Sequence, residues 1–169
     1  MTRTILFTII SMFYSSVFGQ TLENKYAEDV KSINAIIDAY YDVISGSSQD
    51  PWQFERDKYI HAEGAVITRW DENGKVGPYS LEEEYISLLL FPKEDWFEKE
   101  LKRTVSQCGN IAQVWSAFEV RTNPDVESTT RGINSIQLYF EKGRWWISSW
   151  TGVMESDQNN VVFDFLNEN

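Results

Sequence analysis

The side chains best suited to catalysis are single residues rather than clusters. The chain has one histidine, His61, and one cysteine, Cys108. Histidine is the side chain that most readily exchanges a proton near neutral pH, so His61 is a candidate catalytic residue. A lone histidine is more often structural, and both interpretations stay open. A nucleophilic cysteine needs a base beside it, and Cys108 is far from His61 in the sequence, which favours a structural role.

The residue pattern gives no support to metal, nucleotide or cofactor chemistry. One histidine and one cysteine cannot form the usual zinc cluster. The run HAEG at 61–64 matches the H-x-E half of the zinc deaminases, but the P-C-x-x-C half is absent. Neither the phosphate-loop pattern nor the G-x-G-x-x-G dinucleotide pattern occurs. We therefore expect no metal and no cofactor.

The charge balance excludes two classes of partner. The chain of 169 residues has 15 Lys and Arg against 26 Asp and Glu, a net charge of -11. Nucleic acids and anionic membrane surfaces both require a basic surface, so we expect neither as a partner. The acidity is typical of a highly soluble protein, and the run at 98–100 is interpreted as part of a solvated face.

The first nineteen residues have the pattern of a secretory signal peptide. Arg3 precedes an apolar run over 4–18, and the small residue Gly19 ends it. A membrane anchor is the alternative, but the run is short for a bilayer span of about 20 residues. We expect cleavage before Gln20, which leaves one exported domain over 20–169, periplasmic or secreted and free of the membrane. With one cysteine this domain has no internal disulfide, so its core must stabilise it.

The first part of the predicted domain is expected to be helical. An apolar stripe at helical spacing begins near Asp29 and ends before Gly46. Its members are Ile33, Ile36, Ile37, Tyr40 and Ile44. Asp50 and Pro51 form a start signal for a short second helix that ends near Tyr59.

Strands dominate the second half. After a strand over 65–70, a capping box from Ser80 to Glu83 starts a third helix, which ends before Pro92. This helix is expected to bury Leu81, Tyr85, Leu88 and Leu89. Beyond Trp96 the apolar period changes to two, and the predicted strands cover 97–108, 111–121, 131–140 and 144–153. Helices followed by an antiparallel meander predict an α+β fold, with the helices covering one face of the sheet.

Two tight turns, at 109–110 and 142–143, predict which side chains share a face. The pairs expected on the covered face of the first hairpin are Val105–Val114, Arg103–Ser116 and Leu101–Phe118. Those expected on the covered face of the second are Phe140–Trp145, Leu138–Ile147, Ile136–Ser149 and Asn134–Thr151. The outer face is then expected to hold Glu98, Glu100, Thr104, Trp115, Tyr139, Trp146 and Trp150. Contiguous aromatic patches usually mark interfaces, so Trp115, Tyr139, Trp146 and Trp150 predict a homodimer contact.

The last three strands carry a resemblance to a known superfamily. The segments AQVWSAFEVR, RGINSIQLYF and GRWWISSW, in this order of elements, resemble the nuclear-transport-factor-2-like superfamily, in particular small exported bacterial members related to ketosteroid isomerase and polyketide cyclase. The resemblance covers about 28–153, and the pattern Gly143, Trp145, Ile147 is the usual last hairpin of that group. It implies a cone-shaped fold, in which a bent antiparallel sheet wraps around the N-terminal helices and leaves a pocket at its open end.

The resemblance implies a site between the covered sheet face and the first helix. Isomerases of this superfamily use a carboxylate base, and its epoxide hydrolases hold a water with an Asp-Arg-Asp set. The polar side chains that we assign inward are Arg103, Ser116, Asn134, Ser149 and Thr151, none of them acidic. A cation with hydroxyls and no base is typical of a binding site for a polar or anionic ligand; alternatively, Arg103 reaches out to solvent. The expected ligand-binding residues are Arg103, Ser116, Asn134, Trp145 and Tyr41.

Members of this superfamily include enzymes and non-enzymes, so the fold leaves three functions open. The first is non-catalytic binding of a small polar or hydrophobic molecule in an aromatic-lined pocket. The second is an isomerase, dehydratase or hydrolase acting on a hydrophobic molecule, which inward acidic residues would favour. The third is a protein-interaction module that works through the outer face at Trp146 and Trp150.

Overall fold

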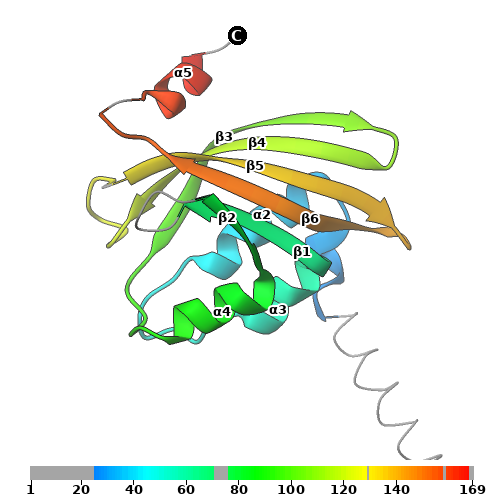
Figure 1. The fold of residues 1–169 in the computed structure, drawn as a ribbon, viewed down its shortest axis with the longest axis horizontal. Coiled ribbons are helices and arrows are strands. Elements are labelled where there is room, and N and C mark those ends of the chain that lie inside the picture. The colour runs from blue at the N-terminus through cyan, green and yellow to red at the C-terminus, as the bar shows by residue number, and fades with distance from the viewer. Residues whose placement is uncertain (1–24, 71–75, 129, 158, 168–169) are drawn as a thin grey trace, which may run out of the picture.

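Helices cover one side of a bent sheet in the computed structural model, which describes residues 25–70, 76–128, 130–157 and 159–167. The predicted signal peptide and its cleavage site lie outside the described residues. In chain order the elements are η1 (Ala27–Val30), α2 (Ile33–Ile44), α3 (Phe54–Ile60), β1 (His61–Trp70), β2 (Val76–Ser80), α4 (Leu81–Leu89), β3 (Phe97–Cys108), β4 (Ile111–Arg121), β5 (Thr130–Glu141), β6 (Arg144–Met154) and α5 (Val161–Asn167). Helices α2, α3 and α4 lie on one side of the sheet and α5 lies on the other (Figure 1).

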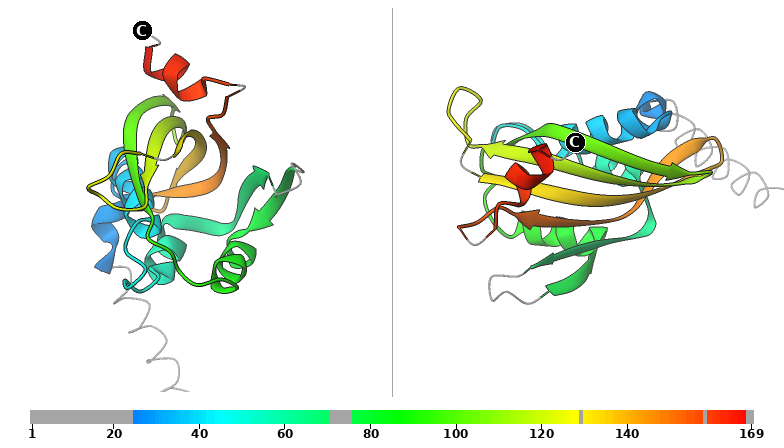
Figure 2. Two further views of the ribbon diagram at one scale, coloured as in Figure 1. Left: turned by 90° about the vertical axis from the view of Figure 1, so that its left-hand side faces the viewer. Right: turned by 90° about the horizontal axis from the view of Figure 1, so that it is seen from above.

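The strands form one sheet in the order β2-β1-β6-β5-β4-β3. Figure 2 shows that this sheet is strongly bent, and the predicted α+β fold with a sheet around N-terminal helices is confirmed. The sheet is mixed rather than purely antiparallel, because β1 runs parallel to β6. Strand β2 is missing from the prediction because Gly77 and Pro78 interrupt its pattern. None of the helices in the described part of the chain is long and apolar enough to span a bilayer.

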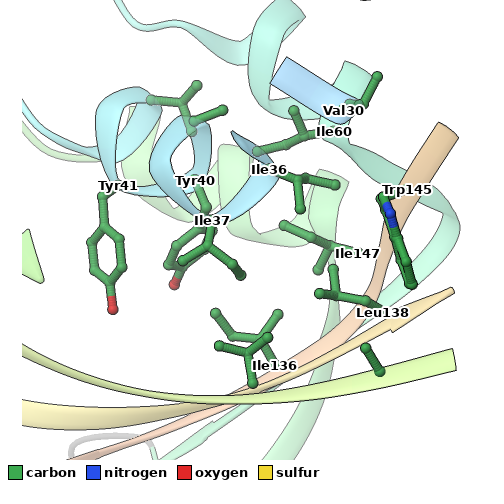
Figure 3. Packing of buried hydrophobic residues seen from close by; sticks show 14 of the residues in the cluster. Val30, Ile36, Ile37, Tyr40, Tyr41, Ile60, Ile136, Leu138, Trp145 and Ile147 are labelled. Carbon is green, nitrogen blue, oxygen red and sulfur yellow. The ribbon is translucent and has the colours of Figure 1, made fainter. Parts of the chain in front are cut away.

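Helix α2 forms the centre of the core. Ser32 is its N-cap, and the Ser32 Oγ accepts a hydrogen bond from the Ala35 amide at 3.1 Å. Of the predicted stripe, Ile36 and Ile37 are fully inaccessible and Tyr40 is buried, whereas the outer members Ile33 and Ile44 are half-buried against the same cluster. The buried side chains point towards the sheet (Figure 3), where they pack in one cluster with Ile136, Leu138, Trp145 and Ile147. The helix starts later than predicted because the separate turn η1 precedes it.

Helix α3 also starts later than its sequence signal. It begins at Phe54 and not at Pro51. The Asp50 carboxylate accepts a hydrogen bond from the Ser47 amide at 2.8 Å, so it stabilises the turn before the helix instead of capping the helix.

The start of α4 follows the predicted capping box. Ser80 Oγ accepts from the Glu83 amide at 3.2 Å, and Glu83 Oε2 accepts from the Ser80 amide at 2.7 Å. Leu81 is buried as expected. The burial of Leu89 was predicted wrongly: it is 62% exposed, because the main sheet contacts of α4 are with β1 and β2 at one edge.

A β-bulge in β3 reverses the faces of its first half. The pairs Val105–Val114 and Arg103–Ser116 are confirmed. The register then shifts between Glu100 and Lys102, so that Glu100 and not Leu101 lies opposite Phe118. A bulge adds one residue to one strand, and one residue is enough to invert every side chain beyond it. The predicted solvated position of Glu98 and Glu100 is therefore wrong, and both lie on the covered face.

A second bulge has the same effect in β6. Phe140–Trp145 and Leu138–Ile147 pair as predicted, but the register shifts after Leu138. Ile136 then lies opposite Trp150, and Asn134 lies opposite Gly152. The predicted outer position of Trp150 is therefore wrong, since it lies on the covered face. The inward assignments of Ser149 and Thr151 are wrong for the same reason.

The outer face of the sheet is partly covered by the chain itself. Val162 of α5 is fully buried against Ala117 and Ile133, and Lys102 Nζ donates to the Phe165 carbonyl oxygen at 2.8 Å. Of the predicted interface residues, Trp115, Tyr139 and Trp146 remain on this face, and Trp115 is 45% exposed. A homodimer through these three residues stays a prediction.

Candidate functional site

A large cavity lies inside the bend of the sheet. Its volume is about 1160 Å³, slightly above the usual range for small-molecule pockets. Its walls come from α2, α3, α4 and the covered face of the sheet, and they are mostly apolar. The aromatic part of the lining consists of Tyr40, Trp52, Phe54, Tyr85, Phe91, Trp96, Phe118 and Trp150.

The carboxylate of Glu98 lines this cavity. Glu98 Oε2 accepts a hydrogen bond from Trp96 Nε1 at 3.0 Å, and the side-chain amide of Asn134 also hydrogen-bonds to this carboxylate. Burial raises the pKa of Glu98 from 4.5 to about 7, and the hydrogen bonds from Trp96 and Asn134 offset only part of the effect. At neutral pH this side chain can therefore both accept and donate a proton.

The backbone around Glu98 is held by the end of α2. Ser45 Oγ accepts from the Glu98 amide at 3.0 Å and donates to the Glu98 carbonyl oxygen at 3.0 Å. Gly46 pairs with Trp96 through two backbone hydrogen bonds of 2.7 and 3.0 Å. Gly46 has φ +147°, a conformation that favours glycine. The chain turn that ends α2 thus fixes the start of β3 and with it the position of the carboxylate.

His61 is the second ionisable group of the cavity. Its side chain is almost fully buried, and Nδ1 lies 2.9 Å from the Asp57 carbonyl oxygen and 3.2 Å from Asp57 Oδ1. Both oxygens accept only, so Nδ1 carries the proton and, in the neutral ring, Nε2 is an acceptor. Nε2 has no hydrogen-bond partner among the described residues, and His61 lines the cavity. The position of the proton on Nδ1 thus leaves Nε2 as the acceptor of the ring.

Asp57 connects this histidine to a tyrosine. The Tyr85 hydroxyl donates to Asp57 Oδ2 at 2.9 Å. Burial, followed by the nearby Asp57 charge, raises the pKa of Tyr85, so the hydroxyl stays protonated as the donor. Burial likewise raises the pKa of Tyr40, which also lines the cavity. Both tyrosines can therefore act only as neutral hydrogen-bonding groups.

The six sequence-predicted candidates for catalysis and ligand binding lie in three places. Asn134 and His61 line the cavity. Arg103, Ser116 and Tyr41 lie together behind it: the Tyr41 hydroxyl is 2.7 Å from Ser116 Oγ. Arg103 is held by Glu100 and Asp38. The sixth candidate, Trp145, packs against Phe140 in the core, with ring centres 5.4 Å apart.

Sequence reasoning missed Glu98 and Asp57. The prediction that no acidic side chain faces inward is wrong, because the bulge in β3 brings Glu98 to the covered face. One signal was available: Trp96 and Glu98 are two residues apart, so they share a face in a strand, and a tryptophan there points to the apolar side. Asp57 precedes His61 by four residues, one helical turn, which places the two side chains together.

Comparison with solved structures finds the same architecture, whereas no family model and no curated protein matches the chain. An NTF2-like protein of unknown function from Pseudomonas putida KT2440 is 11% identical, with a TM-score of 0.59 over 80% of this chain and 91% of that chain. An NTF2-like protein of unknown function from Silicibacter pomeroyi DSS-3 is 16% identical, with a TM-score of 0.52 over 73% and 92% of the two chains. At sequence identities this low, the structural similarity shows the fold alone. The chain has the nuclear-transport-factor-2-like fold, as its sequence predicts.

Proposed function

We propose that the cavity binds an apolar small molecule and that Glu98 transfers a proton to or from it. The observation that carries this proposal is the position of the Glu98 carboxyl group in the wall of a mostly apolar cavity, where burial raises its pKa to about 7. A catalytic acid or base works best when its pKa is close to the working pH. Carboxylates in apolar enzyme pockets are tuned in the same way.

His61 is the second group in this proposal. Its Nδ1 proton is held by Asp57, so Nε2 is left to accept a hydrogen bond from a hydroxyl of the ligand, or to donate one once protonated. A cavity with two such groups suits a reaction in which one group takes a proton and the other supplies one. Isomerisation and dehydration of an apolar molecule that carries a carbonyl or hydroxyl group are reactions of this kind.

Binding of a small polar or hydrophobic molecule without catalysis is the second candidate. The aromatic lining favours it, since the rings would hold an apolar ligand whether or not Glu98 reacts. The two candidates give Glu98 different roles. If the protein is an enzyme, replacing Glu98 by glutamine abolishes turnover, and in both cases the replacement leaves ligand binding intact.

A chromogenic carbon acid tests the proposal without knowledge of the natural substrate. With 5-nitrobenzisoxazole, the Glu98 carboxylate would take the proton at C3 while the ring N–O bond breaks and a coloured phenolate is released. We expect a rate that rises with pH with a midpoint at about 7, because only the ionised form is a base. General-base catalysis contributes at least about 100-fold, and E98Q should lose it.

The matched control is E94Q. Glu94 also lines the cavity but is exposed at its mouth, so its loss should leave the rate unchanged. Equal rates for the wild type and E98Q, or equal losses in E98Q and E94Q, would exclude Glu98 as the base.

We also propose that the protein is exported and forms a homodimer. Export rests on the signal-peptide pattern before Gln20. The dimer rests on the exposed side chain of Trp115, which lies on the same face of the sheet as Tyr139 and Trp146.

A further inference from the structure

A chain of hydrogen bonds runs behind the cavity, between α2 and the sheet. Its members are Arg103, Glu100, Ser116 and Tyr41. Arg103 Nε donates to Glu100 Oε2 at 2.8 Å, and the Ser116 hydroxyl donates to Glu100 Oε1. The Tyr41 oxygen lies 2.7 Å from Ser116 Oγ. The Tyr41 ring extends from α2 towards the sheet (Figure 3), so the hydroxyl reaches the side chains of β4 and β5.

The donors and acceptors in this row of hydrogen bonds can be arranged in one direction only. The Glu100 carboxylate, ionised beside Arg103, can only accept, so Ser116 must give it the single hydroxyl proton of that residue. Ser116 Oγ can then only accept from Tyr41. Burial raises the pKa of Tyr41, so this hydroxyl keeps its proton and can donate it to Ser116. The Tyr41 oxygen is left as an acceptor for its other partner, the side-chain amide of Asn134.

This direction determines which way the Asn134 amide is turned. Only the NH2 group of Asn134 can donate to the Tyr41 oxygen, and an NH2 group is also what the Glu98 carboxylate requires. The amide oxygen then faces away, towards Gly152. A Cβ atom at Gly152 would lie 2.7 Å from Asn134 Oδ1, so the absence of a side chain at position 152 leaves the space for this oxygen.

We infer that Tyr41, Ser116 and Glu100 are positioning residues that lock the Asn134 amide with its NH2 group towards Glu98. The role of this lock in catalysis rests on the proposed function, but the lock itself is a property of the hydrogen bonds. Ser116 is fully buried, and Asn134 and Tyr41 are 3% and 6% exposed. Because these side chains are almost completely buried, a group that loses its hydrogen-bond partner is expected to turn to a neighbouring side chain.

The test is the titration of the Glu98 carboxyl carbon by NMR in carbon-13-labelled protein. In S116A the Tyr41 proton loses its acceptor and turns to the amide oxygen of Asn134, which rotates the NH2 group away from Glu98. A lost hydrogen bond to a carboxylate raises its pKa, here by about one pH unit. In Y41F no hydroxyl competes for the amide, so the midpoint should change little.

The double variant separates positioning from a local packing defect. Y41F/S116A has no Tyr41 proton to turn the amide, so its midpoint should return to that of Y41F. An unchanged midpoint in S116A, or a double variant that shifts as far as S116A, would overturn the inference.

G152A is an independent check, since its Cβ displaces the amide oxygen and should also raise the midpoint. D38N, at an exposed partner of Arg103, is the control that should leave it unchanged. None of these readings depends on turnover, so a failed lock and a failed catalytic proposal are distinguishable.

Discussion

The raised pKa of Glu98 makes a quantitative prediction about protein stability. A carboxyl group whose pKa is 4.5 in the unfolded chain and about 7 in the folded one binds its proton more tightly in the folded state. The associated stability is fully present below pH 4.5 and is lost as the pH rises through about 7. At about 1.4 kcal/mol per pH unit the full loss is about 3 kcal/mol, an upper limit because the cavity is open to solvent on one side.

The substitution E98Q removes this loss and keeps the shape of the side chain. Trp96 Nε1 can still donate to the amide oxygen of glutamine, so at pH 5 the two proteins should have similar free energies of unfolding. At pH 8 the wild type carries a buried charge and the variant does not, and E98Q should be the more stable by up to about 3 kcal/mol.

Urea denaturation followed by tryptophan fluorescence at pH 5 and pH 8 measures this difference. The comparison with the wild type cancels the contributions of the other acidic residues. Glu94, which is exposed, supplies the control, since E94Q should show the same difference from wild type at both pH values. A difference between E98Q and the wild type that is also independent of pH would contradict a raised pKa for Glu98.

Three further predictions concern packing, assembly and export. G132A should destabilise the protein by about 1–3 kcal/mol, because its Cβ would lie 2.5 Å from Phe118 Cζ. The control is G77A, whose Cβ meets only ordinary contacts from 3.7 Å outward and should lower the stability less in thermal unfolding. Equal losses of stability in the two variants would contradict this prediction. W115E should convert a dimer to a monomer in sedimentation analysis, and a monomeric wild type would rule out the dimer. Mass spectrometry of the protein secreted by a bacterial host should find Gln20 at its N-terminus; an intact Met1 would contradict cleavage.

Much of the fold follows from local signals in the sequence. The turns at Gly109 and Gly143 adopt φ +58° and +80°, and they set the hairpin registers near each turn as predicted. The capping box at Ser80 gives the start of α4. These features could be predicted because each depends on a few neighbouring residues.

The candidate site could not be predicted as well, because its faces depend on two β-bulges. The alternation from Phe97 to Val105 fits a regular strand as well as a bulged one. The bulge allows the sheet to bend around α2, and it is this long-range packing, not a local motif, that selects it. One added residue moved Glu98 from the predicted solvent side into the cavity, and a second moved Trp150 to the same side.

The proposed function requires Glu98 to exchange its proton near neutral pH inside the cavity. The most direct test is the NMR titration of the Glu98 carboxyl carbon in the wild-type protein, with its signal assigned by its absence from E98Q. Burial of the carboxyl group in the cavity predicts a midpoint at about pH 7. A midpoint close to 4.5, the ordinary value for a glutamate, would contradict it and leave the cavity without its proposed base.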